Sequence, residues 1–166
     1  MNAGAYGGEM KDVLTSVRVM TEEGEIMELP AEELGLGYRT SIIPEKRYIV
    51  LGAVISLTEG KKEEIKAQMD DLRQKRVSKQ PLEYPSAGST FKRPEGYFAG
   101  KLIQDSGLKG FTVGGAQVSE KHSGFVINKG NATAADVMEL IRQVTAKVKE
   151  DTGVTMEPEV KQIGEF

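Results

Sequence analysis

The sequence contains no cysteine and a single histidine among its 166 residues. The absence of cysteine excludes disulfides, thiolate metal ligands and a cysteine nucleophile, although it leaves the redox compartment open. With His122 as the only imidazole, a zinc site would have to consist mostly of carboxylates, which is uncommon.

Long hydrophobic runs are also missing. No apolar run approaches the roughly 18 to 20 residues that a transmembrane helix needs. The first residues are small and glycine-rich rather than basic and then apolar, so no signal peptide is predicted. We therefore expect a cytoplasmic protein with no membrane partner. A net charge of -3 and a pI near 5.4 argue against general nucleic-acid binding, but they allow a local basic pocket for a phosphorylated ligand.

The composition, 39% apolar and 28% charged, is that of a soluble globular protein with one core or two small ones. β-prone residues 13–20 and 25–29 flank an acidic turn that ends at Gly24, which predicts a hairpin. The isoleucine- and valine-rich residues 48–57 predict a buried strand.

A helix is predicted over residues 59–76, where Ile65, Met69 and Leu72 recur on one face and predict an amphipathic helix. The proline- and serine-containing residues 78–86 follow, and we place a domain boundary near residue 80.

The second half predicts a helix over residues 99–105 and short strands near 111–113 and 124–128. Thr133 and Asp136 form a capping-box pattern that opens a further helix, which ends before Gly153. Its apolar face comprises Val137, Leu140, Ile141, Val144 and Val148. The tail, residues 154–163, is expected to be extended.

Four short segments combine residues that could carry chemistry. The first, residues 2–9, contains Gly4, Gly7 and Gly8, and glycine lets backbone amides approach a ligand closely. It has neither GxGxxG nor Walker spacing, so composition alone favours a tight turn or a flexible start.

The other three segments are Tyr38-Arg39-Thr40-Ser41, Gly88-Ser89-Thr90-Phe91-Lys92 and Glu157-Pro158-Glu159-Val160. An arginine can stabilise a developing oxyanion, although a surface salt bridge is the commoner role. A serine needs an electropositive setting to donate a proton, and without one a glycine–serine pair is usually only a turn. The two glutamates would share one face of a strand unless the proline interrupts it, or they form a solvated tail.

Taken together, these segments resemble the catalytic and flavin-contacting motifs of the UDP-N-acetylenolpyruvoylglucosamine reductase family, which are bacterial flavoenzymes. The resemblance implies that Arg39 stabilises an enolate and that Ser89 protonates the substrate carbanion. It also implies that Glu159, rather than Glu157, enters the active site opposite the serine.

The resemblance further implies cofactor and substrate contacts. FAD contacts would come from Asn2, Gly4, Ala5, Tyr6, Gly7, Gly8 and Arg76. Substrate contacts would come from Lys79, Lys92, Arg93 and His122. Arg93 departs from the asparagine that many members carry, which puts that contact in doubt even though arginine can hold a phosphate or carboxylate.

The implied activity is NADPH-dependent, FAD-mediated reduction of UDP-N-acetylglucosamine enolpyruvate to UDP-N-acetylmuramate for peptidoglycan. The implied fold is α+β, with residues 1–80 as the remaining part of an FAD-binding domain, 81–153 as a substrate-binding domain and 154–166 as a tail returning to the active site. A complete member has a further amino-terminal flavin-binding portion. We therefore expect this chain alone to bind FAD poorly and not to turn over.

Two alternatives stay open. The chain could be a non-catalytic nucleotide-sugar-binding module, which flavin spectroscopy would distinguish. Ser89, His122 and Glu159 could also form a hydrolase triad, although Ser89 lacks the G-x-S-x-G elbow. An ester-hydrolysis assay with a serine-reactive probe distinguishes the hydrolase hypothesis from the reductase hypothesis.

Overall fold

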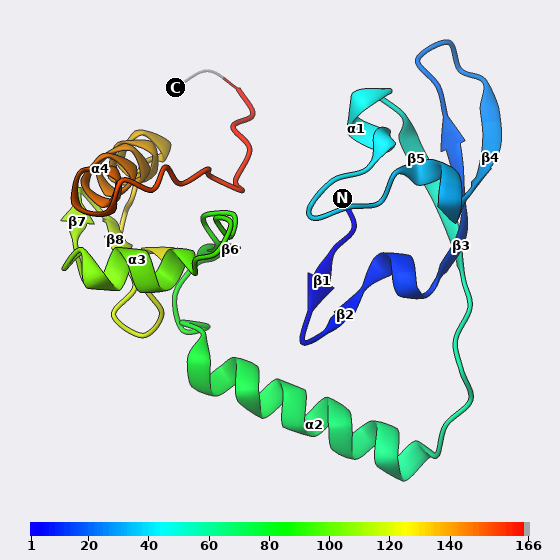
Figure 1. Cartoon of the computed structure of the whole chain (residues 1–166), viewed down its shortest axis with the longest axis horizontal. Helices are drawn as coiled ribbons and strands as arrows, with labels where there is room; N and C mark the ends of the chain where they lie inside the picture. Colours follow the sequence, from blue (N-terminus) through cyan, green and yellow to red (C-terminus); the bar gives the residue numbers. More distant parts are fainter. Residues whose placement is uncertain (165–166) are drawn as a thin grey trace. The chain divides into compact units, whose positions relative to one another are not determined.

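The computed structural model describes residues 1–164 and separates into two compact units. The first unit is Met1–Leu72, and the second begins at Arg73. The division falls within helix α2 (Lys62–Lys79), before the boundary near residue 80 that the sequence favours. Figure 1 shows the order of the elements along the chain.

Unit 1 is built on a three-stranded antiparallel sheet in the order β4-β3-β5. Its strands are β3 (Leu14–Met20), β4 (Ile26–Pro30) and β5 (Ile49–Ile55). A two-stranded hairpin, β1 (Gly4–Ala5) with β2 (Gly8–Glu9), precedes it, and short helices η1 (Met10–Asp12), η2 (Ala31–Leu34) and α1 (Ile42–Glu45) complete the unit.

The predicted β3–β4 hairpin is confirmed. Its turn is closed by a hydrogen bond from the Thr21 N–H to the Glu25 carbonyl at 2.9 Å, and Gly24 supplies the left-handed backbone that the turn requires. Val17, Val19 and Leu34 are buried and form the centre of a small core. These residues cover one face of the hairpin, and Ser16 on the other face of β3 is also buried.

Strand β5 is confirmed as a strand, but the prediction that it is buried is wrong. Each of its seven residues is exposed. The apolar run correctly indicated extended backbone, because branched side chains favour strands. It could not indicate what covers the strand, and β5 lies at an edge of the sheet with only β3 beside it.

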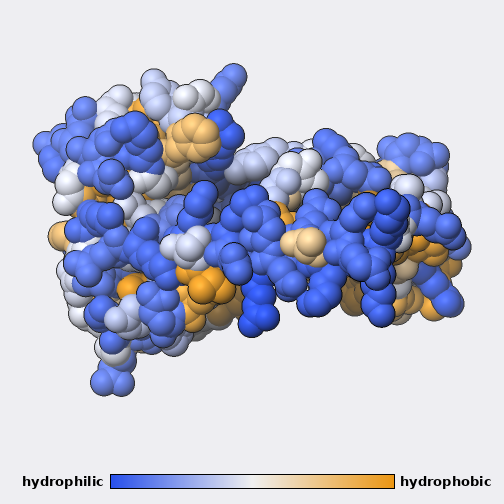
Figure 2. Space-filling view, turned by 90° about the horizontal axis from the view of Figure 1, so that it is seen from below, coloured by the Kyte–Doolittle hydropathy of each residue, from blue (hydrophilic) through white to orange (hydrophobic). Residues whose placement is uncertain are grey.

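Helix α2 also differs from its prediction. The helix forms, but Ile65 and Met69 are exposed and Leu72 is only partly buried. The apolar spacing is real, yet the helix packs no apolar face into either core cluster of the described residues. Figure 2 views the molecule from below, where α2 faces the viewer, and shows a largely hydrophilic surface with isolated hydrophobic spots.

Unit 2 has a four-stranded antiparallel sheet in the order β6-β9-β8-β7. Its strands are β6 (Ser86–Ser89), β7 (Thr112–Val113), β8 (Ala116–Val118) and β9 (Phe125–Asn128). Two helices, α3 (Ala99–Asp105) and α4 (Ala134–Thr152), pack into its core together with Phe91, Leu108 and Met156.

Helix α4 forms as predicted. The Thr133 Oγ1 accepts a hydrogen bond from the Asp136 N–H at 3.1 Å, and the Asp136 carboxylate accepts one from the Thr133 N–H at 2.9 Å. These reciprocal bonds satisfy amides at the helix start. The predicted apolar face is buried at Leu140, Ile141, Val144 and Val148, and Val137 packs against it. Within residues 1–164, no helix is long and apolar enough to cross a membrane.

Candidate functional site

A pocket of about 380 Å³ in unit 1 is lined by the hairpin β1–β2, here called the glycine hairpin (Gly4–Glu9). Tyr6 and Gly7 form its tip and have positive φ angles of 52° and 88°. A Cβ added at Gly7 or Gly8 would meet nothing within 4 Å, so the backbone there faces open space. Five of the six predicted flavin-contacting residues of this segment line the pocket: Gly4, Ala5, Tyr6, Gly7 and Gly8.

Asn2, the sixth, is buried, and its amide is engaged by the protein itself. Its Nδ2 donates to the Glu9 carboxylate at 2.9 Å and to the Gly37 carbonyl at 3.1 Å. Its Oδ1 accepts a hydrogen bond from the Lys11 N–H at 2.9 Å. Asn2 therefore ties the glycine hairpin to the turn that carries Arg39.

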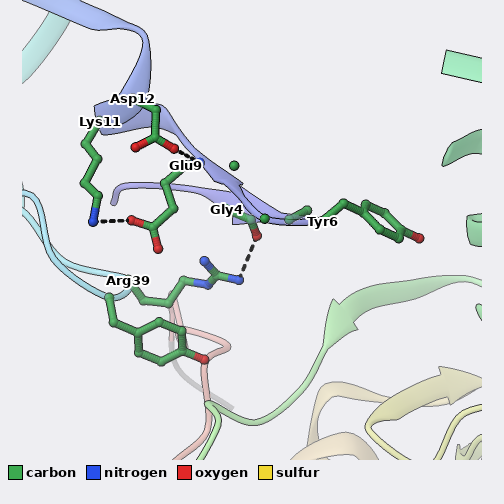
Figure 3. A pocket seen from close by; sticks show the side chains of 10 residues that line it. Gly4, Tyr6, Glu9, Lys11, Asp12 and Arg39 are labelled. Carbon is green, nitrogen blue, oxygen red and sulfur yellow. Dashed lines mark hydrogen bonds and ion pairs between the residues drawn. The ribbon is translucent and has the colours of Figure 1, made fainter. Parts of the chain in front are cut away.

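Arg39 lies in the turn Gly37–Thr40 and lines the same pocket. It has a left-handed φ of 55°, which is uncommon for a residue with a side chain. Its guanidinium lies 5.2 Å from the centre of the Tyr38 ring and donates a hydrogen bond to the Gly4 carbonyl at 3.2 Å. Figure 3 shows the side chain extended toward the glycine hairpin. The structure thus brings the predicted enolate-stabilising residue and the predicted flavin segment together.

Three charged residues of the pocket escaped the sequence interpretation: Glu9, Lys11 and Asp12. The Lys11 Nζ lies 2.8 Å from the Glu9 carboxylate, and hydrogen bonds from Lys11 and Asn2 lower the pKa of Glu9. The Asp12 carboxylate accepts a hydrogen bond from the Glu9 N–H at 2.7 Å, completing a capping box at η1. The Glu-x-x-Asp spacing is the signal that could have revealed this cluster.

Ser89 ends strand β6 in unit 2 and lies opposite Phe125 of β9. Its side chain is exposed, whereas the following residues, Thr90 and Phe91, are buried. Thr90 is anchored twice: its N–H donates to the Gly124 carbonyl at 2.8 Å and its Oγ1 accepts from the Val126 N–H at 3.0 Å. The buried anchors therefore hold Ser89 at the surface in a defined position.

Glu159 lies on the segment that pairs with this region. The Glu159 N–H donates to the Thr90 carbonyl at 2.8 Å, and the Lys92 N–H donates to the Glu157 carbonyl at 2.8 Å. An isolated bridge pairs Phe91 with Pro158 between them. The tail thus runs antiparallel beside residues 90–92, which brings the backbones of Ser89 and Glu159 into the same neighbourhood.

The two glutamates of the tail have different surroundings. Glu157 is exposed and forms an ion pair with Lys92, while Glu159 is partly buried. The Arg93 guanidinium stacks on the Phe98 ring at 4.0 Å and donates to the Tyr97 carbonyl at 3.2 Å. Lys92 and Arg93 follow Ser89 closely in the chain, but the Lys92 ammonium is paired with Glu157 and the Arg93 guanidinium lies on the Phe98 ring.

His122 organises a turn. Its Nδ1 accepts a hydrogen bond from the Gly124 N–H at 3.1 Å, and its ring meets Phe125 edge-on with centres 4.9 Å apart. A hydrolase triad would need both ring nitrogens, one for the serine and one for the acid. One of the two is already used by the turn, so the geometry does not favour that alternative.

The remaining predicted residues, Arg76 and Lys79, lie in the last turn of α2 and are exposed. No group of three or more His, Cys, Asp or Glu side chains in residues 1–164 is arranged to hold a metal ion. Arg39 belongs to unit 1, and Ser89 and Glu159 belong to unit 2. Arg39 therefore shares unit 1 with the glycine hairpin, and Ser89 shares unit 2 with Glu159.

These features define a mixed helix and sheet protein with a glycine-lined pocket next to an arginine, and a surface serine held beside a glutamate-bearing tail. The profile of the family described as UDP-N-acetylenolpyruvoylglucosamine reductase, C-terminal domain, matches residues 80–163, about half of the chain. The chain therefore belongs to the UDP-N-acetylenolpyruvoylglucosamine reductase family.

Relatives of known name agree with this assignment. UDP-N-acetylenolpyruvoylglucosamine reductase of Agathobacter rectalis is 65% identical over 166 residues, covering 100% of this chain and 53% of the relative. The protein of the same name from Lachnoclostridium phytofermentans is 63% identical, covering 99% of this chain and 53% of the relative. The chain thus spans about half the length of these relatives.

A solved structure confirms the mixed helix and sheet fold. The crystal structure of UDP-N-acetylenolpyruvylglucosamine reductase from Thermus caldophilus matches with a TM-score of 0.83 at 40% identity. The match covers 97% of this chain and 57% of the Thermus chain.

Proposed function

We propose that this chain supplies the catalytic residues of a flavin-dependent reductase that converts UDP-N-acetylglucosamine enolpyruvate to UDP-N-acetylmuramate for peptidoglycan, in the cytoplasm. One observation carries the proposal. Each of the three proposed catalytic residues lies in a built local setting, Arg39 within the glycine-lined pocket and Ser89 beside the Glu159 tail. The family assignment supplies the reaction class. In this proposal residues 1–80 are part of an FAD-binding domain and residues 81–153 bind the nucleotide sugar.

The glycine hairpin fits a flavin. Its tip has no side chain at Gly7 or Gly8, so a planar ring can approach the backbone closely, and backbone amides can donate to ring acceptors. Arg76 would add a contact from α2. When bound, FAD would supply the hydride-transfer chemistry, with NADPH as the source of the hydride.

The residues of the chain manage the charge and the proton. Hydride addition at the β-carbon places negative charge on the α-carbon and the neighbouring carboxylate. The site therefore needs cationic or hydrogen-bonding groups already in place beside these atoms. The Arg39 guanidinium would stabilise the resulting enolate, Glu159 would line the same site, and the Ser89 hydroxyl would donate a proton to the α-carbon and regain one from solvent. The anionic nucleotide sugar is bound by Lys79, Lys92, Arg93 and His122. Their local positive charge attracts its phosphates, although the whole chain has a net charge of -3.

The two half-reactions allow a sharp test. The chain is joined to the part of the Agathobacter rectalis relative that lies outside the match, and FAD reduction by NADPH is followed separately from flavin reoxidation by substrate. Ser89→Ala should leave the first half-reaction unchanged and slow the second by about 100-fold or more, since a positioned general acid contributes about 10² to 10⁴.

Thr155→Ala is the control, because Thr155 is an exposed hydroxyl-bearing residue of the same unit. It should leave both half-reactions unchanged. If Ser89→Ala reoxidises as fast as the parent protein, or if it slows flavin reduction equally, Ser89 is not the proton donor.

A further inference from the structure

The carboxyl end of helix α2 is closed by Lys121, a residue outside the motif segments. The helix ends at Lys79. Within a continuing helix the Val77 carbonyl would accept a hydrogen bond from the amide of residue 81, but Pro81 has no N–H. The Lys121 Nζ donates to this carbonyl instead, at 2.9 Å. Lys121 thus supplies the missing donor, and it places a positive charge at the helix end where a cation is favoured.

The same ammonium group also reaches the chain beyond the proline. Its Nζ lies 3.5 Å from the Glu83 carboxylate, so Lys121 contacts the chain both before and after Pro81. The Lys121 side chain is 35% exposed, whereas Lys66, which forms an ion pair on α2, is 73% exposed. Water therefore competes less for the Lys121 contacts than for an ordinary surface pair. The residues that Lys121 joins all belong to unit 2.

Lys121 is itself held in place by a closed turn, residues 119–124. Ser119 is 1% exposed, and its Oγ accepts hydrogen bonds from the Lys121 N–H at 3.1 Å and the His122 N–H at 3.2 Å. The Ser119 N–H donates to the Phe125 carbonyl at 2.9 Å, and the Phe125 N–H donates to the His122 carbonyl at 3.0 Å. The backbone from which the lysine side chain extends is therefore fixed.

These contacts join two places that the proposed function assigns to the substrate. Lys79 follows closely after the Val77 carbonyl that Lys121 holds, and His122 is the residue next to Lys121. The last turn of a helix frays readily, because its final carbonyls have no partner within the helix. Loss of the Lys121 contact would therefore loosen Lys79 without changing Lys79 itself.

We propose that Lys121 is a positioning residue of the reductase, which holds the end of α2 so that Lys79 meets the phosphates of the nucleotide sugar. Lys121 acts through Lys79 and needs no contact with the substrate. The proposal rests on the proposed function, because that function assigns Lys79 to the substrate. Loss of the contact should lower the affinity for the substrate and leave the chemical step unchanged.

Hydrogen exchange on the full chain tests the anchoring without flavin or substrate. In Lys121→Met the amides of residues 77–80 should exchange about threefold faster or more, because a charged hydrogen-bond donor to this turn is removed. Lys121→Arg keeps a cationic donor and should stay close to the parent chain. Lys109→Met is the matched control, since Lys109 is an exposed lysine of unit 2, and it should leave this exchange unchanged.

Protection of the α4 amides in each variant shows that unit 2 still folds. If the amides of residues 77–80 exchange equally fast in Lys121→Met and in the parent chain, Lys121 does not anchor the helix and the proposal is overturned.

Steady-state kinetics of the joined protein test the role toward the substrate. Lys121→Met should raise the KM for UDP-N-acetylglucosamine enolpyruvate by about threefold to tenfold and leave kcat unchanged, and Lys121→Arg should keep the parent KM. When Lys79 is already replaced by methionine, Lys121→Met should raise the KM no further, because both changes remove one interaction. An equal further increase would mean that Lys121 contacts the substrate directly, which overturns the positioning role.

The outcomes separate this proposal from the proposed function. Turnover by the joined protein with a KM that Lys121→Met does not change retains the proposed function and removes the positioning role. A joined protein without substrate-dependent turnover removes the proposed function and with it the substrate role of Lys121, and hydrogen exchange at residues 77–80 then decides the anchoring alone.

Discussion

Asn2 illustrates how one buried side chain can set the geometry of a site. It is 3% exposed, and its three hydrogen bonds reach Glu9, Lys11 and Gly37. The Gly37 contact joins segments 35 residues apart in sequence. No local pattern predicts such a bond, so the structure adds a positioning role to the cofactor contact that the resemblance implies for Asn2.

Replacing Asn2 with alanine should destabilise unit 1. The part-buried Lys11 N–H would lose its partner and the Gly37 carbonyl would keep only the Thr40 N–H at 3.4 Å, and an unsatisfied polar group costs at most about 1 to 3 kcal/mol. Urea unfolding measures the change. Gln68→Ala, an exposed change on α2, should have almost no effect. Equal stability of Asn2→Ala and the parent chain would show that the three bonds contribute nothing.

Glu139 is the residue with the clearest titration signature. Hydrogen bonds from Arg142 and then Gln143 lower the pKa of Glu139 to about 2. Because its pKa is depressed in the folded chain, its stabilising contribution is present above the usual pKa of 4.5 and is lost as the pH falls toward about 2.

Arg142→Gln should raise the pKa of Glu139 toward 4.5, because the charged hydrogen-bond donor that lowers it most is removed. An NMR titration of the Glu139 carboxyl carbon measures it. Lys149→Gln removes a charge from the same helix without touching Glu139 and should leave that pKa unchanged. A Glu139 pKa that stays near 2 in Arg142→Gln would assign the shift to another cause.

At the scale of elements, the turn between β7 and β8 depends on two glycines. Gly114 has a φ of 53°, and a Cβ added to Gly115 would lie 2.2 Å from the Gly130 carbonyl oxygen and 2.5 Å from the Ala132 nitrogen. Both are backbone atoms, so no side chain can move aside. The start of α4 consequently packs directly on this turn.

Gly115→Ala should destabilise unit 2 by about 1 to 3 kcal/mol or more, because overpacking forces the backbone segments apart. Gly130→Ala is the control, since a Cβ there meets nothing within 4 Å and its φ is not left-handed. Thermal unfolding of both variants measures the difference. Equal midpoints would show that the turn has room that the structure does not indicate.

The elements also show what the sequence could predict. Helix α4 was predictable because its capping box and its apolar spacing are both local. Strands β6 and β8 were missed, since they are short and Ser-Ala-Gly-Ser has little strand propensity. The exposure of β5 could not be predicted. An apolar run indicates that a segment favours burial, but it does not show which other residues pack against it.

For the whole molecule, the sequence located the residues of the candidate site but not their surroundings. Motif resemblance named Arg39, Ser89 and Glu159, whereas the pairing of residues 157–159 with 90–92 and the pocket charges Glu9, Lys11 and Asp12 required the structure. The two units carry different parts of the proposed chemistry. The proposed function therefore concerns the full-length reductase, and this chain spans about half the length of its Agathobacter rectalis relative.

The most direct test of this account is flavin spectroscopy with titration of FAD and UDP-N-acetylglucosamine enolpyruvate. It is made on this chain and on the chain joined to the unmatched portion of the Agathobacter rectalis protein. We predict that only the joined protein holds FAD and oxidises NADPH in a substrate-dependent way. If the joined protein folds but does neither, the proposed function of this chain is contradicted.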